Sequence, residues 1–101
     1  MPVRRTADFD AWLGALRDPR AKARIAIRID RLALGNAGDA KPVGSGVSEM
    51  RIDYGPGYRL YFIRRGEALI VLLCGGDKGS QQRDIVRARA LAADLKDGDG
   101  G

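Results

Sequence analysis

Two short stretches of the chain gather arginine, lysine and tyrosine side chains close to turns. The first, residues 49–61, reads EMRIDYGPGYRLY, and the second, residues 75–81, reads GGDKGSQ. Arginine binds a phosphate group through a bidentate fork, and tyrosine offers a stacking face and a hydroxyl. We therefore interpret the two stretches as a candidate phosphodiester site, built from the following residues: Glu49, Arg51, Arg59, Tyr61, Lys78 and Ser80.

The alternation of residue types places the cations on one side of a predicted β-hairpin. In the stretch YRLYFIRR, Leu60 and Phe62 point to one face of a strand, so Arg59 and Tyr61 point to the other. Directly opposed side chains of an antiparallel hairpin lie about 5 Å apart, so Arg51 and Arg59 are predicted to project into one hollow. We expect so short a chain to leave this face of the sheet uncovered.

The glycine-rich stretch GGDKGS contains a lysine and precedes a predicted helix. A helix N-terminus attracts anions, but the Walker spacing of a nucleotide-binding loop is absent. We therefore expect a loop that presents Lys78 and the backbone amides near Ser80 to an RNA backbone, over the same surface as Arg59. The alternative is a solvated sheet face on which Glu49 and Asp53 pair with the arginines, each pair contributing about 0.2–1 kcal/mol.

Composition limits the classes of function that remain. The chain has 101 residues and a net charge of +5, which indicates one domain that attracts polyanions, with an ordinary charged surface as the alternative. It contains no histidine, which excludes serine–histidine and cysteine–histidine catalysis, and we expect no metal site and no cofactor. Cys74 is the only cysteine and lies in an apolar run, which predicts a buried thiol in a reducing compartment. No signal region or membrane-length apolar run is visible, so a soluble cytoplasmic protein is expected.

The periodicities of the chain predict one α+β domain over residues 1–96. The predicted elements are a strand at 2–6, helices from Asp8 and from Pro19 to Gly35, a loop at 36–46, strands at 47–54, 58–65 and 68–74, and a helix at 81–96. The order is thus β-α-α-β-β-β-α, with an N-terminal helical hairpin packed on one face of a small antiparallel sheet. The polar tail 97–101 is expected to be disordered.

Capping residues mark the starts of these helices. Thr6 or Asp8 is a candidate cap for the first, Asp18 with Pro19 for the second, and Ser80 for the last. The last helix carries a narrow apolar stripe, formed by Ile85, Ala88, Ala92 and Leu95.

Two motifs give the chain a resemblance to a known family. The first is acidic–x–Arg, a Gly-Pro-Gly turn and Tyr-Arg–x–Tyr, formed by Glu49, Arg51, residues 55–57, Tyr58, Arg59 and Tyr61. The second is formed by Gly75, Gly76, Asp77, Lys78, Ser80, Gln81, Asp84, Ile85 and Ala88. Through about residue 95 the chain resembles the addiction-module killer proteins, a HigB-like branch of the RelE/ParE toxin superfamily. That branch usually has serine at the position of Gly79.

The resemblance implies the toxin half of a type II toxin–antitoxin system with a microbial-ribonuclease-like α+β fold. The implied activity is cleavage of mRNA, commonly on the translating ribosome, by attack of a ribose 2′-hydroxyl on the adjacent phosphorus. The implied partner is a cognate antitoxin, often a helix-turn-helix protein, and operator DNA would be reached only through that antitoxin. Two alternatives stay open: a ParE-type gyrase poison that cleaves no RNA, and a non-catalytic antitoxin-binding module.

The resemblance also implies roles for individual residues. The implied catalytic residues are Arg59, Lys78, Arg51 and Tyr61, and the implied RNA-binding residues are Arg64, Arg65, Gln81 and Ser80. In this hypothesis Arg59 and Arg51 stabilise the charge that develops at phosphorus. Lys78 or Tyr61 transfers protons, and Glu49 orients an arginine.

Overall fold

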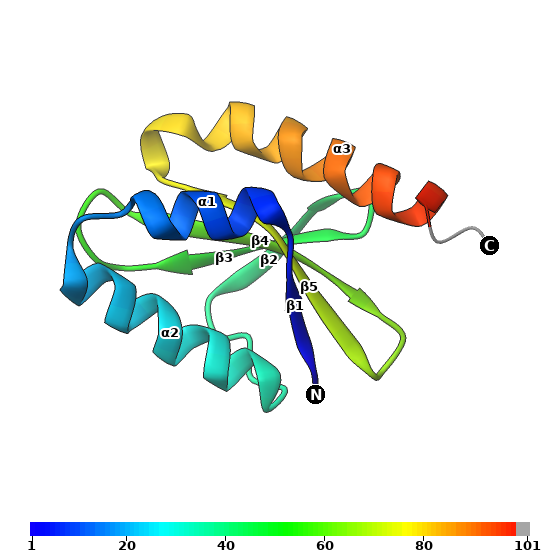
Figure 1. Ribbon diagram of the computed structural model, residues 1–101, viewed down its shortest axis with the longest axis horizontal. Coiled ribbons are helices and arrows are strands. Elements are labelled where there is room, and N and C mark those ends of the chain that lie inside the picture. Colours follow the sequence, from blue (N-terminus) through cyan, green and yellow to red (C-terminus); the bar gives the residue numbers. More distant parts are fainter. Residues whose placement is uncertain (99–101) are drawn as a thin grey trace.

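The computed structural model describes residues 1–98 as an α+β fold with a five-stranded mixed sheet and three helices (Figure 1). In chain order the elements are β1 (Val3–Arg5), α1 (Ala7–Ala15), α2 (Pro19–Ala33), β2 (Ala40–Gly44), β3 (Val47–Ile52), β4 (Tyr58–Arg65), β5 (Leu69–Gly76), a 3₁₀ turn (Lys78–Ser80) and α3 (Gln81–Gly98). Helix α3 extends into the predicted tail, and residues 99–101 of that tail lie outside the described residues. None of the helices described in residues 1–98 combines the length and hydropathy that a bilayer crossing needs.

The predicted starts of the first two helices and the predicted end of the second are confirmed by their caps. The Thr6 hydroxyl accepts a hydrogen bond from the backbone N–H of Phe9, and Asp18 accepts one from Arg20 with Pro19 in the first turn. Gly35 follows the C-cap of α2 with φ +92°, a left-handed conformation that glycine adopts without strain. Short polar side chains thus satisfy N–H groups that a helix start leaves unpaired.

The sheet order β1-β5-β4-β3-β2 corrects the predicted antiparallel sheet. The β3–β4 and β4–β5 pairs are antiparallel as predicted, but β1 pairs in parallel with β5. The predicted N-terminal helical hairpin is also wrong, because β1 comes first and the helices occupy the connection between β1 and β2. Helix α1 packs on β5 and α2 on β3.

A strand occupies part of the predicted loop at 36–46. Residues of β2 pair with β3, Lys41 opposite Glu49 and Pro42 opposite Ser48. Proline cannot donate to a ladder, so it is tolerated here because β2 is the edge strand. Ser45 and Gly46, with φ +58° and +78°, form the tight turn into β3.

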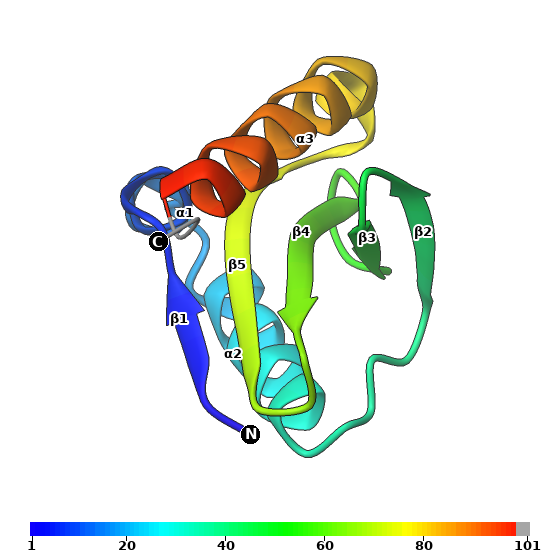
Figure 2. The same ribbon diagram turned by 90° about the vertical axis from the view of Figure 1, so that its right-hand side faces the viewer.

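Helices cover both faces of the sheet, which corrects the predicted one-sided packing (Figures 1 and 2). On one face α1 and α2 bury a core that includes Phe9, Ile25, Leu60 and Phe62. On the other face the predicted apolar stripe of α3 packs over β4 and β5, and this core contains Val47, Tyr61, Val71, Leu73, Cys74, Ala88 and Ala92. Burial raises the pKa of the Cys74 thiol to about 12, in keeping with a packing role.

Two glycines at the end of β5 let the helices of both layers approach closely. A Cβ atom on Gly75 would lie 2.3 Å from the Trp12 ring of α1, and one on Gly76 would overlap the carboxylate of Asp84 in α3. Successive residues of a strand face opposite sides, so Gly75 leaves room for α1 and Gly76 leaves room for α3. The glycines of the GGDKGS motif therefore have a packing role at the two helix contacts.

Replacing Gly75 by alanine is expected to lower the free energy of unfolding by about 1–3 kcal/mol, because the added methyl group overpacks the Trp12 contact. The matched control is Gly14→Ala in α1, where an added Cβ meets nothing within 4 Å. That change should raise stability by about 0.5–1 kcal/mol, the usual helix preference for alanine. Urea unfolding measures both, and a Gly75→Ala variant as stable as the Gly14→Ala variant would contradict the packing assignment.

Candidate functional site

A hollow of about 390 Å³ opens beside the Gly-Pro-Gly turn, where β3 ends and β4 begins. Three of the predicted catalytic residues line it together: Arg51, Arg59 and Lys78. Its other lining residues are Asp39, Ile52, Asp53, Gly57 and Tyr58. We call it the catalytic hollow, after the three lining residues for which a catalytic role was predicted. Three cations and a tyrosine ring on one concave surface are a suitable arrangement for a phosphate attached to a nucleoside.

The hairpin brings the two arginines together. Arg51 and Arg59 are directly opposed in the β3–β4 register, as the alternation predicted. In the turn, Gly55 and Gly57 have φ +57° and +80°, which glycine allows without strain. A Cβ on Gly57 would lie 3.4 Å from Arg59 Nη1 and 3.5 Å from Lys78 Cβ, so the turn brings its backbone against both cations.

A capping box fixes the loop that carries Lys78. The Asp77 carboxylate accepts hydrogen bonds from the backbone N–H groups of Gly79 (2.8 Å) and Ser80 (3.2 Å). The Ser80 hydroxyl accepts from the Asp77 backbone N–H and donates to Asp84. Asp77 thus caps the 3₁₀ turn Lys78–Ser80, and it occupies the amides of Gly79 and Ser80, which were expected to face RNA. The loop contributes the exposed Lys78 side chain to the hollow.

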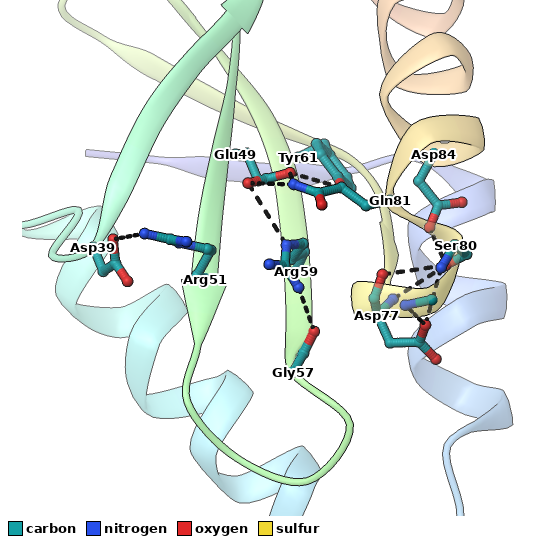
Figure 3. Close-up of polar contacts among 11 residues, drawn as sticks. Asp39, Glu49, Arg51, Gly57, Arg59, Tyr61, Asp77, Ser80, Gln81 and Asp84 are labelled. Carbon is teal, nitrogen blue, oxygen red and sulfur yellow. Dashed lines mark hydrogen bonds and ion pairs between the residues drawn. The ribbon is translucent and has the colours of Figure 1, made fainter.

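Arg59 is nearly buried, with 8% of its surface exposed. Its Nε lies 3.6 Å from Glu49 Oε1, and its Nη1 donates to the Gly57 carbonyl at 3.0 Å (Figure 3). The Nε group itself has no hydrogen-bond partner. A guanidinium has five N–H donors in a rigid fork. Protein contacts therefore hold Arg59 in place from one side, and the hollow that it lines gives a phosphate access to the charge.

A buried network below Arg59 connects β3, β4 and α3. Glu49 is fully buried and accepts hydrogen bonds from the Tyr61 hydroxyl (3.0 Å) and from Gln81 Nε2 (3.0 and 3.2 Å), as Figure 3 shows. A buried carboxylate is stable only when it is paired and hydrogen-bonded. Its contact with Arg59 fits the orienting role that was predicted for Glu49.

Tyr61 and Gln81 do not line the catalytic hollow. Tyr61 has no exposed surface, and its burial, together with the hydrogen bond to Glu49, raises its pKa well above the usual value. It therefore cannot stack on a base or exchange a proton with a substrate in the hollow. The predicted catalytic role of Tyr61 is replaced by a packing role, and Gln81 supports Glu49.

Arg51 differs from Arg59 in its exposure. Its side chain is 46% exposed, and Nη2 lies 3.3 Å from Asp39 Oδ1 (Figure 3). Surface pairs of this kind contribute about 0–1 kcal/mol, so a phosphate can compete for Arg51 with little penalty.

The last two predicted RNA-binding residues lie elsewhere. Arg64 and Arg65, at the opposite end of β4, line a separate hollow of about 320 Å³ together with residues of the β2–β3 turn. Tyr58 was not among the predicted site residues; it lines the catalytic hollow and also packs against the core that contains Leu60 and Phe62. Within residues 1–98 no group of three or more His, Cys, Asp or Glu side chains is placed to hold a metal ion.

Comparison with known proteins shows a relative that is similar over most of the chain. No family model matches the chain. A protein of Haemophilus influenzae (strain ATCC 51907 / DSM 11121 / KW20 / Rd), named only "Uncharacterized protein", is 50% identical over 93 residues, which cover 92% of this chain and 94% of that protein.

Replacing Glu49 by leucine is expected to lower the free energy of unfolding by about 3–5 kcal/mol, because it leaves the charge of Arg59 buried without its carboxylate. The double variant Glu49→Leu/Arg59→Leu should recover much of this loss, since it removes both buried charges. Urea unfolding of the two single variants and the double variant gives the coupling energy. Strictly additive effects would show that the two side chains do not stabilise one another.

Proposed function

We propose that this chain, which belongs to one protein family with the Haemophilus influenzae relative, is the toxin component of a type II toxin–antitoxin module and an mRNA endoribonuclease. The fold is proposed to be RelE-like, of the microbial-ribonuclease type. The observation that carries the proposal is the convergence of Arg51, Arg59 and Lys78 on one hollow beside a tyrosine. The motifs that supply these residues are the same motifs that carry the resemblance to HigB-like toxins.

The proposed reaction is attack of a ribose 2′-hydroxyl on the adjacent phosphorus, which forms a 2′,3′-cyclic phosphate and releases the 5′-oxygen of the next nucleotide. Negative charge grows on the phosphorane oxygens in the transition state. Arg59, held by Glu49 and the Gly57 carbonyl, is a preorganised charge that needs no rearrangement when the reaction occurs. Arg51 binds the same phosphate after leaving Asp39.

Proton transfer falls to the polar groups that line the hollow. Tyr61, the other candidate of the sequence hypothesis, has no exposed surface and cannot reach a substrate, and the same holds for Glu49. The exposed ammonium of Lys78 is the proposed acid that protonates the leaving 5′-oxygen. The carboxylate of Asp53 is the proposed base for the 2′-hydroxyl, because carboxylates serve as general bases and Asp39 is already paired with Arg51.

The proposed partners follow from the same reading. The substrate is mRNA, on the ribosome during translation, and a cognate antitoxin of the helix-turn-helix type neutralises the toxin. The reaction needs no cofactor, because every group it requires is a side chain of the hollow. The net charge of +5 supports attraction to a polyanionic substrate.

Lys78→Ala is the sharpest test of this function, because Lys78 is exposed and no buried carboxylate depends on it. Brief induction of the wild type should cut mRNA and leave 2′,3′-cyclic phosphate and 5′-hydroxyl ends. The variant should cut about 10²–10⁴-fold more slowly, the usual contribution of a general acid. Mapping of RNA ends in cells measures the rate, and Arg83→Ala, at an exposed position outside the hollow, is the control that should retain full cleavage.

Arg59→Lys complements this test, since it keeps a positive charge beside Glu49 but removes the bidentate fork. Cleavage should fall while the protein stays folded. Undiminished growth arrest in both variants would remove the hollow from the mechanism. A DNA-damage response without mRNA cuts would replace the proposal by the gyrase-poison alternative.

A further inference from the structure

A second hollow, of about 300 Å³, lies next to the catalytic hollow. Three arginines of α2 line it, Arg24, Arg28 and Arg31, together with Ile27, Ile52 and Asp53. We call it the α2 hollow. Ile52 and Asp53 line both hollows, so the two meet at the end of β3 and form one groove from Lys78 to Arg31.

The three arginines form one row along α2. They are spaced four and three residues apart, which puts them on the same face of a helix. From Arg24 to Arg31 the row covers about 10 Å of the axis at ~1.5 Å per residue. That length matches about three stacked nucleotides at ~3.4 Å each. Within residues 1–98, none of the three arginines forms an ion pair with a carboxylate, so their charges are available to a ligand.

Arg28 ties this row to the catalytic hollow. Its Nη1 donates to the backbone carbonyl of Arg51 at 2.7 Å, and its Nη2 donates to the carbonyl of Ala37 at 3.1 Å. Both acceptors are neutral, so the positive charge of Arg28 is not cancelled. The contact fixes α2 against the strand that carries Arg51, and it therefore sets the position of one hollow relative to the other.

The groups that line the groove between the catalytic hollow and the α2 arginines favour an RNA strand whose phosphates lie apart from one another. Asp53 stands at the boundary, where its carboxylate repels a phosphate but can accept a hydrogen bond from a ribose hydroxyl or a base. Beside the arginines, Ile27 is 50% exposed and offers an apolar contact to a base or sugar. The guanidinium carbon of Arg24 lies 4.7 Å from the centroid of the Tyr54 ring, and this cation–π contact holds the guanidinium near the groove.

From this geometry we infer that the α2 hollow is a second binding site, which takes the backbone phosphates of single-stranded RNA next to the phosphate in the catalytic hollow. The inference rests on the proposed function for the identity of the strand. Arg24 and Arg31 supply two phosphate contacts outside the reacting group, and Asp53 separates them from the phosphate at Arg59.

The test uses an RNA strand of about twelve nucleotides that carries 2′-O-methyl groups, which removes the nucleophile and so separates binding from cleavage. Each phosphate contact to a single strand contributes about 0.7 to the slope of log K against log salt. The double variant Arg24→Gln/Arg31→Gln should therefore lower the slope by about 1.4, equivalent to about 25-fold weaker binding at 0.1 M salt relative to a 1 M reference. Fluorescence anisotropy over a series of salt concentrations measures both.

The matched control is Arg4→Gln/Arg83→Gln, which removes the same charge from exposed positions that line neither hollow. The inference requires that this variant keep the wild-type slope, and thermal unfolding checks that both double variants are folded. Equal slopes for the two double variants would overturn the inference and leave the proposed function untouched. Failure of the wild type to bind the strand at all would also overturn the inference, whereas the proposed function stands or falls with the mRNA cleavage test in cells.

Discussion

The buried pair of Glu49 and Arg59 is the interaction on which the arrangement of the candidate site depends. The desolvation penalty of the fully buried Glu49 carboxylate must be offset by ion pairing and hydrogen bonds. Its partners are the Arg59 guanidinium and the Tyr61 hydroxyl from β4 and the Gln81 amide from α3. Because these partners come from separate elements, the pair forms only when the sheet and α3 are packed together. The charge that faces the catalytic hollow is therefore an outcome of the whole fold.

The two-sided packing of the sheet explains why the pair is buried. The apolar stripe of α3 covers the face that holds Tyr61 and Leu73, and it lies close because Gly76 leaves room for Asp84 and Ser80. Near the start of α3 the cover ends, and the catalytic hollow opens between the Gly-Pro-Gly turn and Lys78. The position of α3 therefore explains both why one side of Arg59 is buried and why its other side faces the hollow.

Local patterns in the sequence were sufficient to predict several features of the structure. The alternation around the turn predicted the opposed positions of Arg51 and Arg59, since a period of two and a tight turn fix the register of a hairpin. The cap residues Thr6 and Asp18 likewise act within a few residues of their own position.

Features that depend on distant contacts were missed. The stretch AKPVG has weak strand character, and it is a strand because β3 supplies its partner. The parallel pairing of β1 with β5 joins residues far apart in the chain.

Burial was the other property that the sequence pattern did not reveal. Tyr61 and Arg59 alternate with core residues as residues of an exposed face do, and only the position of α3 shows that this face is covered. The α2 arginines were not among the predicted site residues, because a helix in isolation gives no sign of the strand beside it. Asp39 was missed for the same reason, since it belonged to a predicted loop.

The central claim is that Arg51, Arg59 and Lys78 hold one phosphate between them. The most direct measurement is an NMR titration with a 2′-O-methyl dinucleotide, which has a single phosphodiester, while the side-chain signals of arginine and lysine are followed. The account predicts that the signals of Arg51, Arg59 and Lys78 shift together along one binding curve, while those of Arg64 stay in place. Separate curves for the three residues, or a response centred on Arg64, would contradict it.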